Sequence, residues 1–285
     1  MYTRGSNLNF TRDIDQVPAS QLSAGTQPYP QFTSVGAIYF DGHSNYNALQ
    51  LRAVKKASRG LTFTVNYAWS KTMDTGTSNG HATDIDVWQN AYDPAANYST
   101  STLNIANSLT GSATYELPFG HGREFALKGL ADEVVGGWRL SGVFQAHGGL
   151  PFTPTMSSDS SNSKAVSCYC GFAWLPNVVG SAKVSNPNNT QWFNPAAFTS
   201  PTAGTFGNEK RNSVYGPSWR DLDLSLSKTF TLPEKINFEI RADAFDSLNN
   251  ANFGQPNASI GSGSAGTITS ANTYRQVQLG GRITF

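Results

Sequence analysis

The sequence predicts an all-β protein, an antiparallel transmembrane β-barrel segment of about eight strands with long extracellular loops. Three observations predict it. Apolar and polar residues alternate along many segments, several of these segments reach ten residues or more, and the connections between them are alternately short and long. The composition agrees, because charged residues make up only 14% of the chain, against about 25% in an ordinary soluble domain.

Along the chain, residues 1–33 are expected to be an irregular N-terminal segment, and residues 34–285 to form one continuous barrel portion. The clearest strand is 61–69, in which Leu61, Phe63 and Val65 fall on one face and the threonines between them on the other. The same alternation predicts strands at residues 34–40, 46–54, 61–69, 107–117, 137–149, 219–230, 235–245 and 274–285.

The length of these strands favours a membrane wall. Strands of soluble sheets average about five or six residues, whereas a tilted barrel strand needs about 9–11 residues to cross a bilayer. No segment approaches the run of about 18 apolar residues that a helical span requires, so the chain is expected to cross with strands.

Charged side chains alternate with the apolar ones along these strands. In a barrel they would line a wet, ion-paired interior, and in a soluble sandwich they would form the solvent-exposed face. The residues assigned to the interior are Arg139, Asp221, Asp223, Glu239, Arg241, Asp243 and Arg282.

The connections alternate in length as they do in a barrel inserted from one side. They are short near 55–60 and 231–235, intermediate at 118–136, and long at about 71–105, 150–218 and 248–272. Short turns lie on the periplasmic rim of such barrels and long loops lie outside. Phe285 is therefore expected at the periplasmic rim.

Aromatic residues are expected to form two girdles at the membrane interfaces. The short-turn girdle would contain Phe119, Trp138, Phe230 and Phe285, and the long-loop girdle Tyr67, Trp69, Trp219 and Tyr274.

Several stretches resemble one family. "SNYNALQLRAVKKASRGLTFTVNYAWSKTMD", "YELPFGHGREF", "GGWRLSGVFQAHGGLPFTPT", "FEIRADAFDSLNNANFGQPN" and "RQVQLGGRITF" are similar to the C-terminal part of TonB-dependent outer-membrane receptors, in particular the Oar-like group with a carboxypeptidase-regulatory-like N-terminal domain. The resemblance covers about residues 44–285. It implies a bacterial outer-membrane location, a 22-stranded barrel, a plug domain and a TonB box. We expect this chain to lack the plug and the TonB box and to be the last third of such a receptor.

The resemblance also implies a function and partners. The intact parent would bind and import a large solute of siderophore, glycan or peptide type. Its partners would be outer-membrane lipid, the barrel assembly machinery, an unknown solute, and the TonB complex through the missing N-terminal parts. The terminal "ITF" resembles the assembly signal of barrel proteins, which assigns that role to Ile283 and Phe285; alternatively, Phe285 is only the last girdle residue.

One long loop carries Trp192, Phe193 and Phe198 among polar neighbours. These rings either staple the loop over the barrel mouth or contact a ligand by stacking. Stapling is the favoured role, and the three residues remain the candidates for ligand binding.

Motifs of enzymes and of metal or cofactor sites were sought in the sequence as well. The sequence contains no nucleophile, zinc or phosphate-cradling motif, so we expect no enzyme, no cofactor and no metal site. The net charge of +1 gives no reason to expect nucleic acid as a partner. Cys168 and Cys170 are expected to form a loop disulfide or remain idle thiols.

Two acidic pairs have the spacing that begins a calcium loop, Asp13 with Asp15 and Asp84 with Asp86. They lack the glycine and closing glutamate of such a loop and are expected to be solvated charges.

Two other functions stay open. A passive small barrel, acting as a pore or an adhesin, would close on its own strands. A soluble carbohydrate-binding sandwich would instead bury Val65, Leu224 and Leu226.

Overall fold

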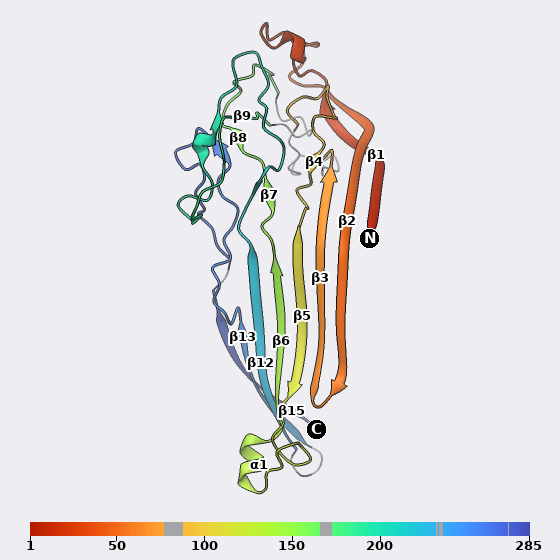
Figure 1. The fold of residues 1–285 in the computed structure, drawn as a ribbon, viewed down its shortest axis with the longest axis vertical. Helices are drawn as coiled ribbons and strands as arrows, with labels where there is room; N and C mark the ends of the chain where they lie inside the picture. Colours follow the sequence, from red (N-terminus) through yellow and green to blue (C-terminus); the bar gives the residue numbers. More distant parts are fainter. Residues whose placement is uncertain (77–87, 166–172, 232, 234–235, 273) are drawn as a thin grey trace.

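The computed structural model describes residues 1–76, 88–165, 173–231, 233, 236–272 and 274–285. Its centre is one long antiparallel sheet in which each strand pairs with its neighbour along the chain (Figure 1). The eight strands, in sheet order, are β1 (Tyr2–Asp13), β2 (Gly36–Ser58), β3 (Leu61–Asp74), β5 (Asn107–Glu116), β6 (Trp138–His147), β12 (Trp219–Thr231), β13 (Asn237–Phe245) and β15 (Gln276–Thr284). The fold is all-β, as predicted. β4 (Ser99–Thr100) adds a short pairing to β3.

The register separates the side chains into two faces. Val65 lies opposite Ala53 and Gly111, and Leu224 lies opposite Gly142 and Ala244. Residues directly opposite each other in an antiparallel pair point to the same side of the sheet. We call the side that carries these residues the apolar face and the other side the polar face.

The two ends of the sheet differ as the connection lengths predict. At one end lie the turn between β2 and β3, the last residues of β12, the first residues of β13, and α1 (Leu130–Val135), and the long loops lie at the other end (Figure 1). The C-terminus reaches the short-turn end. Within the described residues, no helix has the length and hydropathy needed to cross a membrane.

The N-terminal third of the sheet corrects the sequence prediction. Residues 1–33 were expected to be irregular, yet they contain β1, and the two strands expected at 34–40 and 46–54 are one strand, β2. Two register shifts in β1 and the positive φ of Asn7 break the period of two, which is why alternation does not reveal this strand. The sheet has eight strands, as expected, because the unexpected β1 makes up for the merging of two expected strands into β2.

The sheet is open. Among the described strands, β1 pairs with β2 alone and β15 with β13 alone, so the two ends of the sheet do not meet. β1 covers Gly36 to Asn47 of β2, and residues 49–58 of β2 have no strand on that side. The sheet therefore presents two edges with unpaired backbone groups.

The largest hydrophobic cluster of the described residues lies in the loops. Met156, Phe193, Ala197, Phe198 and Ile260 pack together within the long-loop assembly. Short strands and turns organise this assembly: β7 (Pro151–Phe152) with β11 (Val214–Tyr215), β8 (Thr155–Met156) with β14 (Ser259–Ile260), β9 (Asn177–Val178) with β10 (Phe198–Thr199), η1 (Ala19–Gln21) and η2 (Pro195–Ala197).

The apolar face of the sheet is, in contrast, exposed. Val65 is 36% exposed and Leu226 is 37% exposed, and Leu224 is half-buried. A soluble sandwich would bury all three beneath a second sheet, so this observation contradicts that alternative. An exposed apolar face along strands of this length is what lipid contact requires.

Candidate functional site

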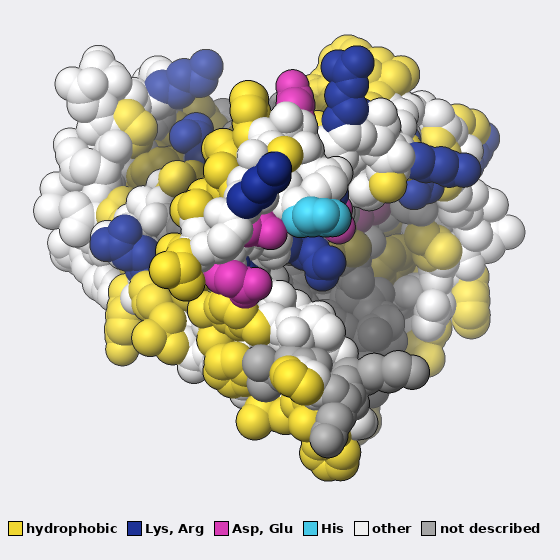
Figure 2. Space-filling view, turned by 90° about the horizontal axis from the view of Figure 1, so that it is seen from below, with side chains coloured by type: hydrophobic (Ala, Val, Ile, Leu, Met, Phe, Trp, Pro, Cys, Tyr) yellow, Lys and Arg dark blue, Asp and Glu magenta, His cyan; other side chains and the backbone are white. Residues whose placement is uncertain are grey.

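The polar face carries all seven charged residues that the alternation assigned to an interior. Arg282 lies opposite Glu239, Asp243 opposite Ser225, and Arg241 opposite Ser227. Alternate residues of one strand share a face, so Asp221 and Asp223 lie on the same face as Ser225. Arg139 of β6 lies opposite Ser227 and therefore on this face as well. Seen from the short-turn end, charged side chains of both signs lie near the centre of the molecule, with hydrophobic side chains in patches on its flanks (Figure 2).

Some of these charges are paired. Arg241 Nε donates to Asp243 Oδ2 at 2.7 Å, and Glu116 accepts from Arg123 at 2.7 Å and lies 3.7 Å from Arg139. Both glutamate contacts are at the short-turn end, where the side chains are about two-fifths exposed or more. The two glutamate contacts are solvent-accessible, so each contributes little to stability, typically about 0–1 kcal/mol.

The long-loop girdle needs a correction. Tyr67 and Trp69 lie on the apolar face, but Trp219 shares the face of Asp221, and Tyr274 lines a cavity beside it. The Trp219 ring stacks on that of His147, with centroids 5.6 Å apart. The girdle was assigned from the position of each ring along its strand. Side-chain parity, which that assignment left out, puts Trp219 on the polar face.

The three aromatic residues of the 192–198 loop have different surroundings. Phe193 is 1% exposed, with its ring 5.6 Å from that of Phe152 and 6.0 Å from that of Phe198, so both Phe193 and Phe198 belong to the loop core. Trp192 is half-buried, and its indole N–H donates to the Tyr215 carbonyl at 2.8 Å. The contacts agree with the stapling alternative, and a ligand contact stays a prediction.

Asp13 and Asp15 are not the solvated loop charges that were expected. The Asp15 carboxylate is fully buried and accepts from the Tyr29 N–H at 2.7 Å and from Gln27 Nε2 at 3.1 Å. Asp13 Oδ1 accepts from the N–H groups of Asp15 and Val35. The two carboxylates thus organise the loop between β1 and β2. Asp84 and Asp86, the second pair, lie outside the described residues.

Burial changes the acid–base behaviour of this loop. Burial raises the pKa of Asp13 above its usual value, while the N–H groups of Val35 and Asp15 oppose the rise. Burial also raises the pKa of Tyr92, with a further rise from the nearby charges of Asp13 and Asp15. The Tyr92 hydroxyl donates to the Ile14 carbonyl at 2.5 Å, which joins the 88–98 segment to the same loop.

Two arginines hold the loops to the sheet. The buried guanidinium of Arg12 pairs with Asp41, donates to the Ala91 carbonyl, and lies 4.0 Å from the centre of the Tyr39 ring. Arg211 is buried as well and pairs with Asp74 at the loop end of β3. Each arginine links segments that are far apart in the sequence, so the loop assembly is continuous with the strands.

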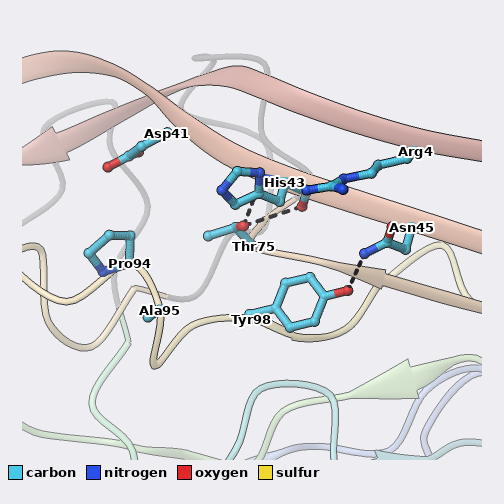
Figure 3. A pocket seen from close by; sticks show the side chains of 8 residues that line it. All are labelled: Arg4, Asp41, His43, Asn45, Thr75, Pro94, Ala95 and Tyr98. Atoms are coloured by element: carbon cyan, nitrogen blue, oxygen red, sulfur yellow. Dashed lines mark hydrogen bonds between the residues drawn. The ribbon is translucent and has the colours of Figure 1, made fainter.

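A cavity of 630 Å³ lies where β1 and β2 meet the 94–98 segment (Figure 3). Arg4, His43 and Asn45 reach it from the strands, and Tyr98 faces them from the loop. Much of its polar lining is already used within the protein, because Asn45 donates to the Tyr98 hydroxyl and Asp41 pairs with Arg12.

The residues assigned to the assembly signal lie on the free edge strand. Ile283 is in β15, which has β13 on one side and no described strand on the other. Phe285 follows the last paired residue and is completely exposed. Its aromatic ring is therefore at the short-turn end, as predicted.

Cys168 and Cys170 lie outside the described residues. Among the described side chains, no group of three or more histidine, cysteine or acidic residues is placed to hold a metal ion. The sequence analysis missed Phe245 and Asp246, which line the same cavity as Tyr274. The period of β13 places Phe245 on the polar face and could have identified it.

The family comparison agrees with this architecture. The family model described as "Outer membrane beta barrel domain" matches residues 3–278. The outer membrane transporter YddB from Escherichia coli aligns with 99% of this chain at 10% sequence identity and a TM-score of 0.47. This chain spans 29% of the length of that transporter. No curated protein matches the sequence.

Proposed function

Because this chain belongs to the family of outer membrane beta barrel domains and lies in the bacterial outer membrane, we propose that it forms one part of the wall of a larger barrel that imports a solute. The open sheet is the observation that carries this proposal. β1 and β15 each leave an edge unpaired among the described strands, and unpaired backbone groups in lipid cost several kcal/mol each. Further strands between these edges would close the wall.

The two faces then acquire different roles. The apolar face would contact lipid, and the polar face, with Arg139, Asp223 and Arg282, would line the lumen. The ion pairs between Arg241 and Asp243 and between Arg123 and Glu116 suit a wet interior, where water screens charges that lipid would not.

Solute binding would take place at the long-loop end. Loops there share a hydrophobic core and are tied to the strands by two arginine–aspartate pairs in which both arginines are buried, so they form a preorganised rim and not separate flexible segments. We propose that this rim and the upper polar face recognise a large solute of siderophore, glycan or peptide type.

TonB dependence is the finer part of the proposal and is supported by the family resemblance of the strands and of the "ITF" terminus. The chain would act as the C-terminal part of a receptor in which other segments supply the plug and the TonB contact. Deletion of TonB should then abolish uptake by the intact receptor without removing it from the outer membrane. Uptake that persists without TonB would favour a passive pore.

A matched pair of cysteine variants tests the arrangement of the wall. Leu224→Cys and Ser225→Cys change adjacent residues of β12 on opposite faces. In intact cells, and in a background in which Cys168 and Cys170 are replaced by serine, a charged thiol reagent should label the cysteine at 225 through the wet lumen and leave the cysteine at 224 unmodified in lipid. Equal labelling of both positions, or labelling of 224 alone, would contradict the proposed wall.

A further inference from the structure

A second cavity, of 440 Å³, lies on the polar face at the long-loop end, where β12, β13 and β15 meet the loops. Its lining combines acidic and aromatic side chains. The carboxylates are Asp221, Asp223 and Asp246, and the rings are Trp219, Phe245 and Tyr274.

Asp246 is a buried carboxylate whose hydrogen bonds are incomplete. Its side chain is only 7% exposed, and its Oδ1 accepts from the Asn250 N–H at 3.1 Å. Its Oδ2 is buried and has no hydrogen-bond partner within the described residues. Asp221 Oδ1 is in the same condition and lines the same cavity. Two buried carboxylate oxygens therefore lack the partners that such groups normally have.

Nearby cations are occupied elsewhere. Arg275, next to Tyr274 in the sequence, donates to the Ser247 carbonyl at 3.4 Å, and Arg241 pairs with Asp243. Neither arginine lines the cavity, and no described lysine does. The third carboxylate, Asp223, accepts from the Asp246 N–H at 3.0 Å, which holds Asp246 at the wall. The cavity thus has an excess of negative charge.

The side chains that line the cavity indicate that its ligand is a cation, and they indicate which kind. A buried carboxylate is costly unless a positive charge or several hydrogen bonds compensate it. Aromatic faces attract organic cations, which have apolar surface to bury, and they supply no ligand to a hard metal ion. Three carboxylates beside three rings therefore suit an alkylammonium or guanidinium group.

We propose that this cavity binds the ammonium or guanidinium group of a cationic solute, such as a basic side chain of a peptide. The ammonium hydrogens would donate to Asp246 Oδ2 and Asp221 Oδ1, and the alkyl stem would pack on the Trp219 and Phe245 rings. This inference rests on the proposed function, because the polar face must line a solvent-filled lumen for a solute to reach the cavity.

Binding of dansylcadaverine, a fluorescent primary amine, tests the inference by fluorescence anisotropy on the intact receptor purified in detergent. Its N-acetylated form has nearly the same shape without the charge. The amine should bind at least about tenfold more tightly than the acetylated form, and added salt should weaken it.

The variant Asp221→Asn/Asp246→Asn removes two charges and keeps an oxygen at position 246 for the Asn250 N–H. Its affinity for the amine should fall by at least about tenfold. Asp221→Asn alone leaves the contacts of Asp223 and Asp246 intact and should show part of that loss. Glu239→Gln is the matched control, because it removes a polar-face charge outside the cavity, and it should change affinity by less than about twofold.

Equal binding of the two probes, or unchanged amine binding by the double variant, would overturn the inference. A double variant that fails to migrate as a folded barrel leaves Asp221→Asn as the deciding variant. Failure of the labelling at position 225 would instead reject the wet lumen and hence the proposed function, whereas labelling at 225 with no preference for the amine would reject only the cation site.

Discussion

Arg211 Nη2 donates both to the carboxylate of Asp74 and, at 2.6 Å, to its backbone carbonyl, across 137 residues of sequence. Both side chains are buried. The contact fastens the segment before β11 to the loop end of β3, so the rim and the wall are one unit.

Replacing Arg211 by methionine should release the loops, because it leaves the buried charge of Asp74 without its partner. Such a loss typically costs about 3–5 kcal/mol. Hydrogen exchange of the loops should accelerate while the paired strands stay protected. Arg123→Met removes the exposed pair with Glu116 and should cost less than about 1 kcal/mol. Equal effects of both variants would contradict the structural role of the buried pair.

The loop between β1 and β2 should be more stable in acid than at neutral pH. The folded-state pKa of Asp13 is raised, chiefly by burial. A raised pKa gives stability that is fully present below the unfolded-state pKa and is lost as the pH rises through the folded-state value. Protection of residues 11–35 against hydrogen exchange, corrected for intrinsic rates, should therefore decrease as the pH rises from acid. Asp13→Asn should remove this dependence, and Asp159→Asn should not.

Phe193→Ala should open the loop core. The ring is almost fully buried against Phe152 and Phe198, and such truncations typically cost about 3–5 kcal/mol. Limited proteolysis of the loops measures the effect, with the exposed Phe32→Ala as a control that should change little. A Phe193 variant with intact loops and weakened solute binding would favour the ligand-contact role.

Gly149→Ala should strain the junction between β6 and β12. A Cβ at Gly149 would lie 1.8 Å from the Gly216 carbonyl oxygen, so the backbone would have to shift. Overpacking of this kind typically costs about 1–3 kcal/mol. Gly280→Ala on β15 meets no atom within 4 Å and should be nearly neutral. Urea unfolding of the two variants in detergent compares them directly.

Phe285→Ala should slow assembly into the outer membrane while leaving the folded barrel nearly as stable as before. The ring is fully exposed and lies beyond the last pair of β15, so it contributes little packing within the chain. The rate at which the heat-modifiable form appears measures assembly. Val277→Ala changes an exposed residue at the other end of the same strand. A similar delay in both variants would indicate a general loss of hydrophobicity in β15 and not a terminal signal.

Alternation alone predicted much of the fold, and its failures have physical causes. It identified β3, β5 and β6 because their period is unbroken, and it missed β1 because two register shifts interrupt the pattern. It placed Arg139 and Asp223 on one face by parity, and the register of β6 with β12 puts both on the same side of the sheet. It could not predict that Arg211 meets Asp74 or that Asp246 is buried, since these depend on how distant loops pack.

The order of pairing in the sheet has a consequence for the time course of folding. Every strand of the main sheet pairs with the long strand that precedes or follows it along the chain, so the wall can grow one strand at a time. The long connections raise the closure cost only slowly, by about 0.6 kcal/mol for each doubling of loop length. The contact between Arg211 and Asp74 instead requires β3, β5 and β6 to be in place first. We therefore expect the rim to become protease-resistant last, after the strands have already acquired their protection.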